Sequence, residues 1–285
     1  MLLPPYWQVT PIALVALAVG IGHAIGLRRL AQRQTPAHRR ATRRRSWAFY
    51  GGLAGLILVA SGPLERWAMA RLSVHMVLHI LEMFYLPPLL IIGAPTVPLL
   101  FALPVHRRRR LLRWYYRSSW TTALRGSWAA LSNPIVAIVL FNGVMILWHL
   151  PAVFNWAAYH GWVMDWLMAP SFVIVGLLFW RIIVPSHPWG PRGSTRIQIG
   201  AIVVTAFEML ILAMAMSIFT KAPWYSMNVV MEGPVGALRD QQYAAGILWI
   251  CGDFWAIPAL VYVGYRIYGK DGGMSASLER VLGRV

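Results

Sequence analysis

Two histidines, a glutamate and a methionine share one predicted helical face in an apolar segment at residues 73–92. His75 and His79 are four residues apart, and Glu82 and Met83 follow at intervals that continue the same face. Hydrocarbon disfavours such polar side chains, so their presence predicts a site that binds a metal ion or carries protons. Imidazole with thioether is a ligand combination that suits Cu(I).

Other histidines repeat this combination with methionine. His149 lies four residues after Met145, and Met164 and Met168 follow His160 by four and eight residues. Methionine is also an ordinary filler of apolar helices, so each thioether has core packing as an alternative role. The predicted metal ligands are His75, His79, His149, His160 and Met83, with Glu82, Met164, Met168 and Asp240 as further candidates. For Asp240 the alternative is an N-cap at the start of the last helix.

Acidic side chains also fall near the middle of predicted spans. These are Glu82, Glu208 and Asp253. A central aspartate costs about 2.5 to 3.5 kcal/mol on insertion into a membrane, so something must compensate. Two interpretations stay open: a proton or cation path with hard metal ligands, or protonated side chains that hydrogen-bond to a neighbouring helix.

The elements that carry these residues are predicted to be membrane-spanning helices. Hydrophobic residues make up 58% of the 285 residues and charged residues 12%, with a mean hydropathy of +0.57. Apolar windows long enough to span lie at residues 9–27, 47–63, 73–92, 134–150, 165–184, 197–219 and 241–264. We therefore predict an all-α integral membrane bundle of about seven helices, with residues 1–285 as a single domain.

The net charge of +17 is unevenly distributed between alternate loops. Twenty-two of the 26 lysines and arginines fall on one side of the predicted spans and four on the other. The positive-inside rule then places the N-terminus outside, the C-terminus inside, and the histidine-rich ends of the helices on the outer face. The rule also predicts two basic cytoplasmic loops, at residues 28–46 and 106–133. We expect the first to be a polar linker and the second to contain an interfacial helix at 118–133. This pattern favours contact with membrane lipids over binding of nucleic acid.

Several motifs occur in an order that resembles a known family. They are His75-Met76-Val77-Leu78-His79, Leu86-Pro87-Pro88-Leu89-Leu90, Gly93-Ala94-Pro95, Trp148-His149-Leu150-Pro151, the Gly176–Trp180 run, and Asp240-Gln241-Gln242 with Gly246 and Trp249. Residues 73–265 look like the multi-spanning CtaG-type assembly factors of bacterial cytochrome c oxidase. The resemblance implies a non-enzymatic protein of the bacterial cytoplasmic (inner) membrane that supports copper insertion. Its implied partners are oxidase subunits and a copper-donating chaperone.

The chain departs from the family pattern in two places. Family members often have a further histidine in the fifth helix, where this chain reads Asp165-Trp166-Leu167-Met168-Ala169-Pro170. Met164, Met168 or Asp165 could take its place. Glu82 stands where an apolar residue is more usual.

Other functions remain open from the sequence. His75 or His79 with His149 could ligate a haem in an electron carrier, and a copper or proton-coupled transporter would use the same residues. A membrane hydrolase is disfavoured because no nucleophile and base are paired. A retinal protein is excluded by the lack of a lysine inside the last span, since Lys270 follows it.

Overall fold

The computed structural model describes residues 7–270, except for the side chains of residues 66, 252, 253 and 268–270. All elements in this range are helical. They are α1 (Pro11–Ala31), α2 (Pro36–Ser61), α3 (Pro63–Ala70), α4 (Leu72–Ile80), η1 (Leu81–Tyr85), α5 (Leu86–Ile92), α6 (Thr96–Ala102), α7 (Val105–Arg117), α8 (Trp120–Leu131), α9 (Pro134–His149), α10 (Pro151–Tyr159), α11 (Gly161–Val163), η2 (Met164–Met168), α12 (Ala169–Ile183), α13 (Thr195–Ser217) and α14 (Ser226–Lys270). The elements η1 and η2 are π-helical turns.

Five helical stretches are long and apolar enough to cross a membrane. They are Pro11–Ala31, Leu72–Ile92, Gly161–Ile183, Thr195–Ser217 and Ser226–Ile267. Two bent helix pairs, α2 with α3 at 42° and α8 with α9 at 75°, are also apolar enough, and the described residues contain seven spans if each pair counts as one. The prediction of an all-α membrane bundle of about seven helices is confirmed.

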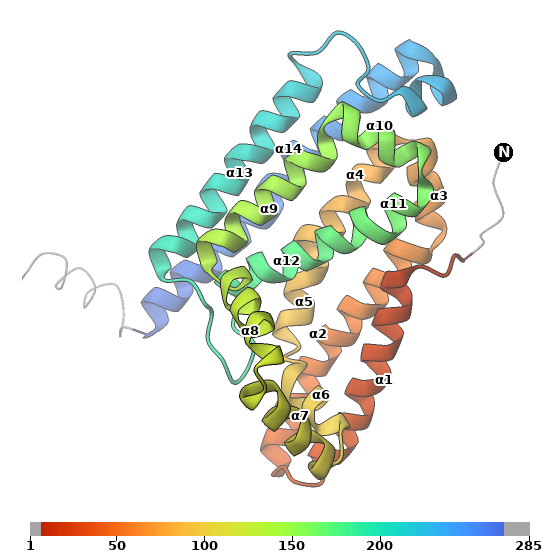
Figure 1. The fold of residues 1–285 in the computed structure, drawn as a ribbon. Helices are drawn as coiled ribbons and strands as arrows, with labels where there is room; N and C mark the ends of the chain where they lie inside the picture. Colours follow the sequence, from red (N-terminus) through yellow and green to blue (C-terminus); the bar gives the residue numbers. More distant parts are fainter. Residues whose placement is uncertain (1–6, 271–285) are drawn as a thin grey trace, which may run out of the picture.

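The helices form two packed groups that share α12. In Figure 1, α9, α13 and α14 lie on one side of the bundle, α1 and α2 lie on the other, and α4, α5 and α12 run between them. One hydrophobic cluster joins α4, η1, α9, α12, α13 and α14. A second joins α1, α2 and α5, and it includes Val173 of α12.

Proline and glycine set where several helices begin and bend. Pro11, Pro36 and Pro134 stand at the first position of their helices, where the missing N–H costs nothing. Gly233 in α14 has a φ of 72°, which only glycine adopts readily, and it bends this long helix ahead of Pro234.

Two predictions about helix boundaries were wrong. The expected linker at residues 28–46 is mostly helical, because α1 continues to Ala31 and α2 starts at Pro36. Arginine is a good helix former, so a charged segment can extend a span beyond the apolar window. The last helix begins at Ser226 rather than at Asp240. The predicted interfacial helix at 118–133 is present as α8.

The basic and histidine-rich segments lie at opposite ends of the bundle. Figure 1 shows α7, α8 and the junction of α1 with α2 at one end, and α3, α10 and the start of α4 at the other. Arg280 and Arg284, which also entered the charge count, lie outside the described residues. The positive-inside prediction requires such a separation of basic and histidine-rich ends. Which end faces the cytoplasm stays a prediction.

Candidate metal centre

Three of the predicted histidine ligands meet at one buried place. The ring centroids of His75 and His79, one turn apart on α4, are 4.2 Å apart. His149, at the end of α9, places its ring centroid 5.8 Å from that of His79. All three side chains are buried, with Phe154 packed on His75 and Phe172 on His79.

Each of these three rings has a buried nitrogen without a hydrogen-bond partner among the described residues. These atoms are Nε2 of His75, Nδ1 of His79 and Nε2 of His149. Nδ1 of His149 lies 2.6 Å from the carbonyl oxygen of Met145, which can only accept. Nδ1 therefore carries the proton, and the neutral ring keeps its lone pair on the free Nε2. A buried polar atom without a partner costs about 1 to 3 kcal/mol, so three together fit a site that binds an ion or water.

A cavity of about 50 Å³ adjoins His75 and His79. Besides these rings, its polar and sulfur-bearing walls are Thr10, Glu65, Glu82, Asp165, Met69, Met164 and Met168. The aliphatic walls come from the second hydrophobic cluster, whereas Met164 and Met168 belong to the first, so the cavity lies where the two groups of helices meet. This volume can hold one metal ion or a few water molecules, since one water needs about 10 to 15 Å³ on this scale.

Both π-helical turns contribute to this cavity. The η1 turn supplies Glu82, and the η2 turn supplies Met164, Asp165 and Met168. A π turn inserts an extra residue into a helix and is frequent at functional sites. The structure therefore places two irregular turns from different spans against one cavity.

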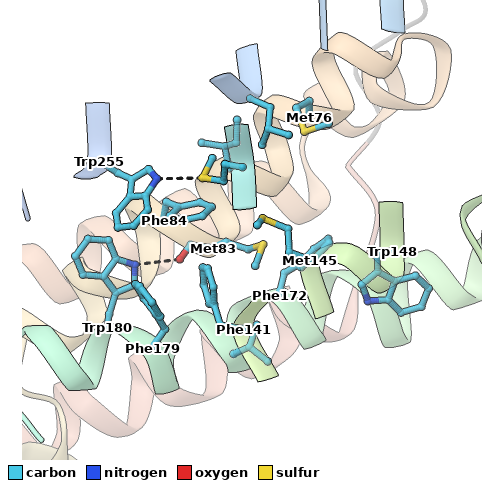
Figure 2. Close-up of a cluster of buried hydrophobic side chains, with 14 of the residues drawn as sticks. Met76, Met83, Phe84, Phe141, Met145, Trp148, Phe172, Phe179, Trp180 and Trp255 are labelled. Carbon is cyan, nitrogen blue, oxygen red and sulfur yellow. Dashed lines mark hydrogen bonds between the residues drawn. The ribbon is translucent and has the colours of Figure 1, made fainter. Parts of the chain in front are cut away.

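A hydrogen bond between two spans supports η1. The carbonyl oxygen of Met83 has no helical donor four residues later, because that residue is Pro87. The indole Nε1–H of Trp180 donates to it instead, at 3.1 Å (Figure 2). Gly176 permits this close approach of α12, because a Cβ there would lie 2.8 Å from Pro87 Cγ and 2.9 Å from the Met83 oxygen.

The end of α9 is held by the loop before α14. The hydroxyl of Tyr225 donates to the His149 carbonyl oxygen at 3.0 Å. Burial raises the pKa of the Tyr225 phenol, so it stays protonated as a donor. Asn155 accepts from the Ser226 N–H at 2.9 Å and fixes the same loop to α10. These bonds fix the position of the His149 backbone.

Two predicted ligands lie elsewhere than the sequence pattern indicated. Met83 packs in the first hydrophobic cluster with Phe84 and Phe141, as Figure 2 shows, and it does not line the cavity. The prediction that Met83 lies on the same helical face as His75 and His79 is therefore wrong. The π turn η1 adds a residue after His79 and so rotates the following side chains away from that face. His160 is exposed, and its Nδ1 pairs with the Trp156 carbonyl oxygen at 2.8 Å.

Asp240 joins two helices through its carboxylate. It accepts hydrogen bonds from the backbone N–H groups of Leu72 and Ser73 and from the Ser73 hydroxyl. It therefore caps α4 from α14, and the expectation that it caps its own helix is wrong. Its oxygens are already occupied by these donors.

The other acidic side chains have different surroundings. Glu208 on α13 is half-buried, and neither carboxylate oxygen has a partner among the described residues. The side chain of Asp253 lies outside the described part of the chain. Glu65 was not recognised from the sequence, although it is one of only nine acidic residues and is followed by an apolar helix face.

The described residues contain no group of three or more His, Cys, Asp or Glu side chains that could hold a metal ion as arranged. His75 and His79 form a different set of possible ligands when they are combined with Met164 or Met168, because this set includes a methionine thioether. Neutral imidazole and thioether ligands suit Cu(I). The imidazole and thioether side chains therefore share one cavity, and their donor types are those that a soft ion prefers.

Comparison with known proteins gives a consistent result. A family model described as cytochrome c oxidase caa3 assembly factor (Caa3_CtaG) matches residues 21–270. The chain is 29% identical over 269 residues to uncharacterized proteins of Mycobacterium bovis and Mycobacterium tuberculosis, and 27% identical over 263 residues to one of Mycobacterium leprae. Each comparison covers 88% of this chain but only 37% of the relative, so the chain spans little more than a third of their length. No solved structure matches the chain.

The family match includes α2 to α14, the π turns and all three buried histidines. Because it covers most of the chain, the protein belongs to the family of cytochrome c oxidase caa3 assembly factors.

Proposed function

We propose that the protein assists the assembly of a cytochrome c oxidase in the bacterial cytoplasmic membrane by binding Cu(I) and passing it to an oxidase subunit. The observation that carries this proposal is the set of three buried histidine rings, each with a free nitrogen, of which two line a cavity that also has methionine thioethers in its walls. The family supplies the oxidase as the target. The role is that of a carrier and scaffold rather than of an enzyme.

In this proposal His75 and His79 hold the ion, since both line the cavity and both have a free nitrogen. Met164 or Met168 supplies a thioether from the opposite wall. His149 is the third imidazole, which packs near His79 and is not among the residues that line the cavity. Neutral ligands in small number bind Cu(I) without forming a closed site, which allows the ion to leave.

The positive-inside prediction sets the face from which copper arrives. If the basic end is cytoplasmic, the histidines lie toward the outer face, and a copper-donating chaperone of that compartment would deliver the ion there. Copper would then reach the oxidase without crossing the membrane. Glu65 and Asp165 at the cavity wall would attract the cation from outside.

A copper-binding measurement tests the proposal. In anaerobic competition with a Cu(I) chelator, we expect His75→Ala and His79→Ala each to lower affinity at least tenfold, about 1.4 kcal/mol. His187→Ala, in an exposed loop, is the matched control and should leave affinity unchanged. Cells with the first two variants should accumulate haem a but have low oxidase activity that added copper partly restores.

Two results would contradict the proposal. One is a wild-type protein that takes up no Cu(I), and the other is equal affinity in wild type and both variants. A haem electron carrier is the main alternative, but the cavity of about 50 Å³ beside the histidines is several times smaller than the roughly 300 to 1,000 Å³ of typical cofactor pockets. The geometry therefore favours copper at this place.

A further inference from the structure

A second and much larger cavity opens elsewhere in the bundle. It has a volume of about 1090 Å³ and lies between α1, α2, α5, α12 and the segment 184–194. Its walls are mainly aliphatic side chains, such as Val15, Leu53, Leu90 and Ile174. This size is at or above the upper end of the roughly 300 to 1,000 Å³ found for pockets that bind small molecules.

One end of this cavity carries two arginines. Arg181 and Arg192 both line it. The backbone N–H of Arg192 donates to the backbone carbonyl oxygen of Arg181 at 3.0 Å, so the two residues are adjacent. Nη1 of Arg181 is buried and has no hydrogen-bond partner among the described residues. The ion pair found in the described part of the chain joins Arg71 to Glu232 and involves neither arginine. Arg181 is half-buried and Arg192 is exposed, but a buried cationic N–H without an acceptor is costly, so this end favours an anionic acceptor.

The length of the cavity corresponds to one leaflet of a membrane. Along α12 its wall runs from Pro170 to Arg181, eleven residues or about 16 Å at 1.5 Å per residue. This is about half of the roughly 30 Å hydrocarbon core of a bilayer. Trp128, Trp189 and Tyr116 also line the cavity, and such side chains gather at the level of lipid headgroups.

We propose that this cavity binds one anionic phospholipid, with an acyl chain along α12 and the phosphate on Arg181 and Arg192. Guanidinium groups bind phosphate oxygens in pairs, which matches the free donor of Arg181. Nη1 of Arg192 already donates to the Ser132 carbonyl oxygen at 3.3 Å, but a neutral quinone would leave Nη1 of Arg181 without a charged acceptor. Haem fits less well because the described lining has no histidine, cysteine or methionine to ligate iron.

This lipid would also connect the two groups of helices. Ile12 lines both this cavity and the smaller one beside the histidines. An acyl chain there would fill the space between α1, α2 and α12, which otherwise would be open. The proposal does not depend on copper binding.

The test uses the full chain purified in mild detergent. Native mass spectrometry should show one retained phospholipid, and phosphatidylglycerol in mixed micelles should raise the unfolding temperature more than phosphatidylcholine does. Arg181→Gln and Arg192→Gln should each weaken the apparent affinity for phosphatidylglycerol at least fivefold. Arg196→Gln, an exposed residue with the same charge change, is the matched control and should change it less than twofold.

Two further measurements separate the lipid from other occupants. Ile174→Trp fills the apolar part of the cavity at a side chain that is 57% exposed, so it should reduce retention of the lipid without disturbing the core. Glycerol phosphate alone should not stabilise the protein, because it lacks the acyl chain. Equal affinity for phosphatidylglycerol in wild type, Arg181→Gln and Arg192→Gln would overturn the proposal. Retention of a haem, a quinone or only free phosphate would do the same.

Discussion

Replacing Trp180 by phenylalanine removes the one donor that the described residues give to the Met83 carbonyl oxygen. Because Pro87 cannot donate to that oxygen, the variant leaves a buried carbonyl without a partner. Leaving such a group unpaired costs about 1 to 3 kcal/mol in free energy of unfolding. The loss of indole volume adds a packing term that has to be separated from this value.

Trp255→Phe supplies that separation. Trp255 is also buried, and its Nε1–H donates to the Met209 sulfur at 3.2 Å (Figure 2). A thioether is a weak acceptor that needs no hydrogen bond. Trp255→Phe therefore loses the same side-chain volume, but it loses little free energy from an unpaired acceptor. The difference between the two variants therefore isolates the Met83 carbonyl.

Thermal unfolding in detergent measures that difference. A change of 1 kcal/mol shifts the midpoint by roughly 2 to 4 °C for proteins of this size class, so Trp180→Phe should unfold roughly 2 to 12 °C below Trp255→Phe. Equal midpoints, or a lower midpoint for Trp255→Phe, would refute the interpretation that α12 stabilises η1 through this bond.

The remaining predictions concern topology and the histidine site. Reporter fusions after Arg117 should be cytoplasmic and fusions near His160 should lie outside, given the charge distribution; finding both on one side would contradict the seven-span bundle. Glu82→Gln keeps the shape of a side chain that lines the cavity, so we expect normal amounts of protein but impaired oxidase maturation, whereas loss of folded protein would indicate a structural role. Tyr225→Phe removes the bond to the His149 carbonyl and should weaken Cu(I) binding a few-fold in wild type but not in a His149→Ala background, as a double-mutant cycle would show.

Composition and charge were sufficient to predict the class of fold. The apolar windows correspond to the helices because a membrane requires every backbone group to be paired within its own segment. The helix boundaries were less predictable, since arginine-rich residues 36–45 continue a helix that the hydropathy window leaves out. The role of Asp240 could not be predicted either, because its hydrogen-bond partners Leu72 and Ser73 are far from it in the sequence.

The site was predicted in part. The four-residue spacing of His75 and His79 holds because both lie in the regular helix α4. Their approach to His149 was expected from a shared end of the bundle, and the structure adds the rings' distances and the free nitrogens. Glu65 could not be placed, because it reaches the cavity through the bend between α2 and α3.

The failure of the single-face prediction beyond His79 has a physical cause that the sequence does contain. Each π turn ends two residues before a proline, η1 before Pro87 and η2 before Pro170. The proline ring clashes with the carbonyl group four residues earlier, and proline has no N–H to donate to that carbonyl oxygen. A wider π turn relieves the clash and adds one residue to the turn. The added residue turns Met83 into the aromatic core and leaves Glu82 at the cavity, so residues before and after the turn face different surroundings. At Pro87 and Pro170, proline inside an apolar window thus marks where a regular 100° projection should stop, although Pro258 in α14 has no π turn before it. Both π turns supply walls of the candidate metal centre.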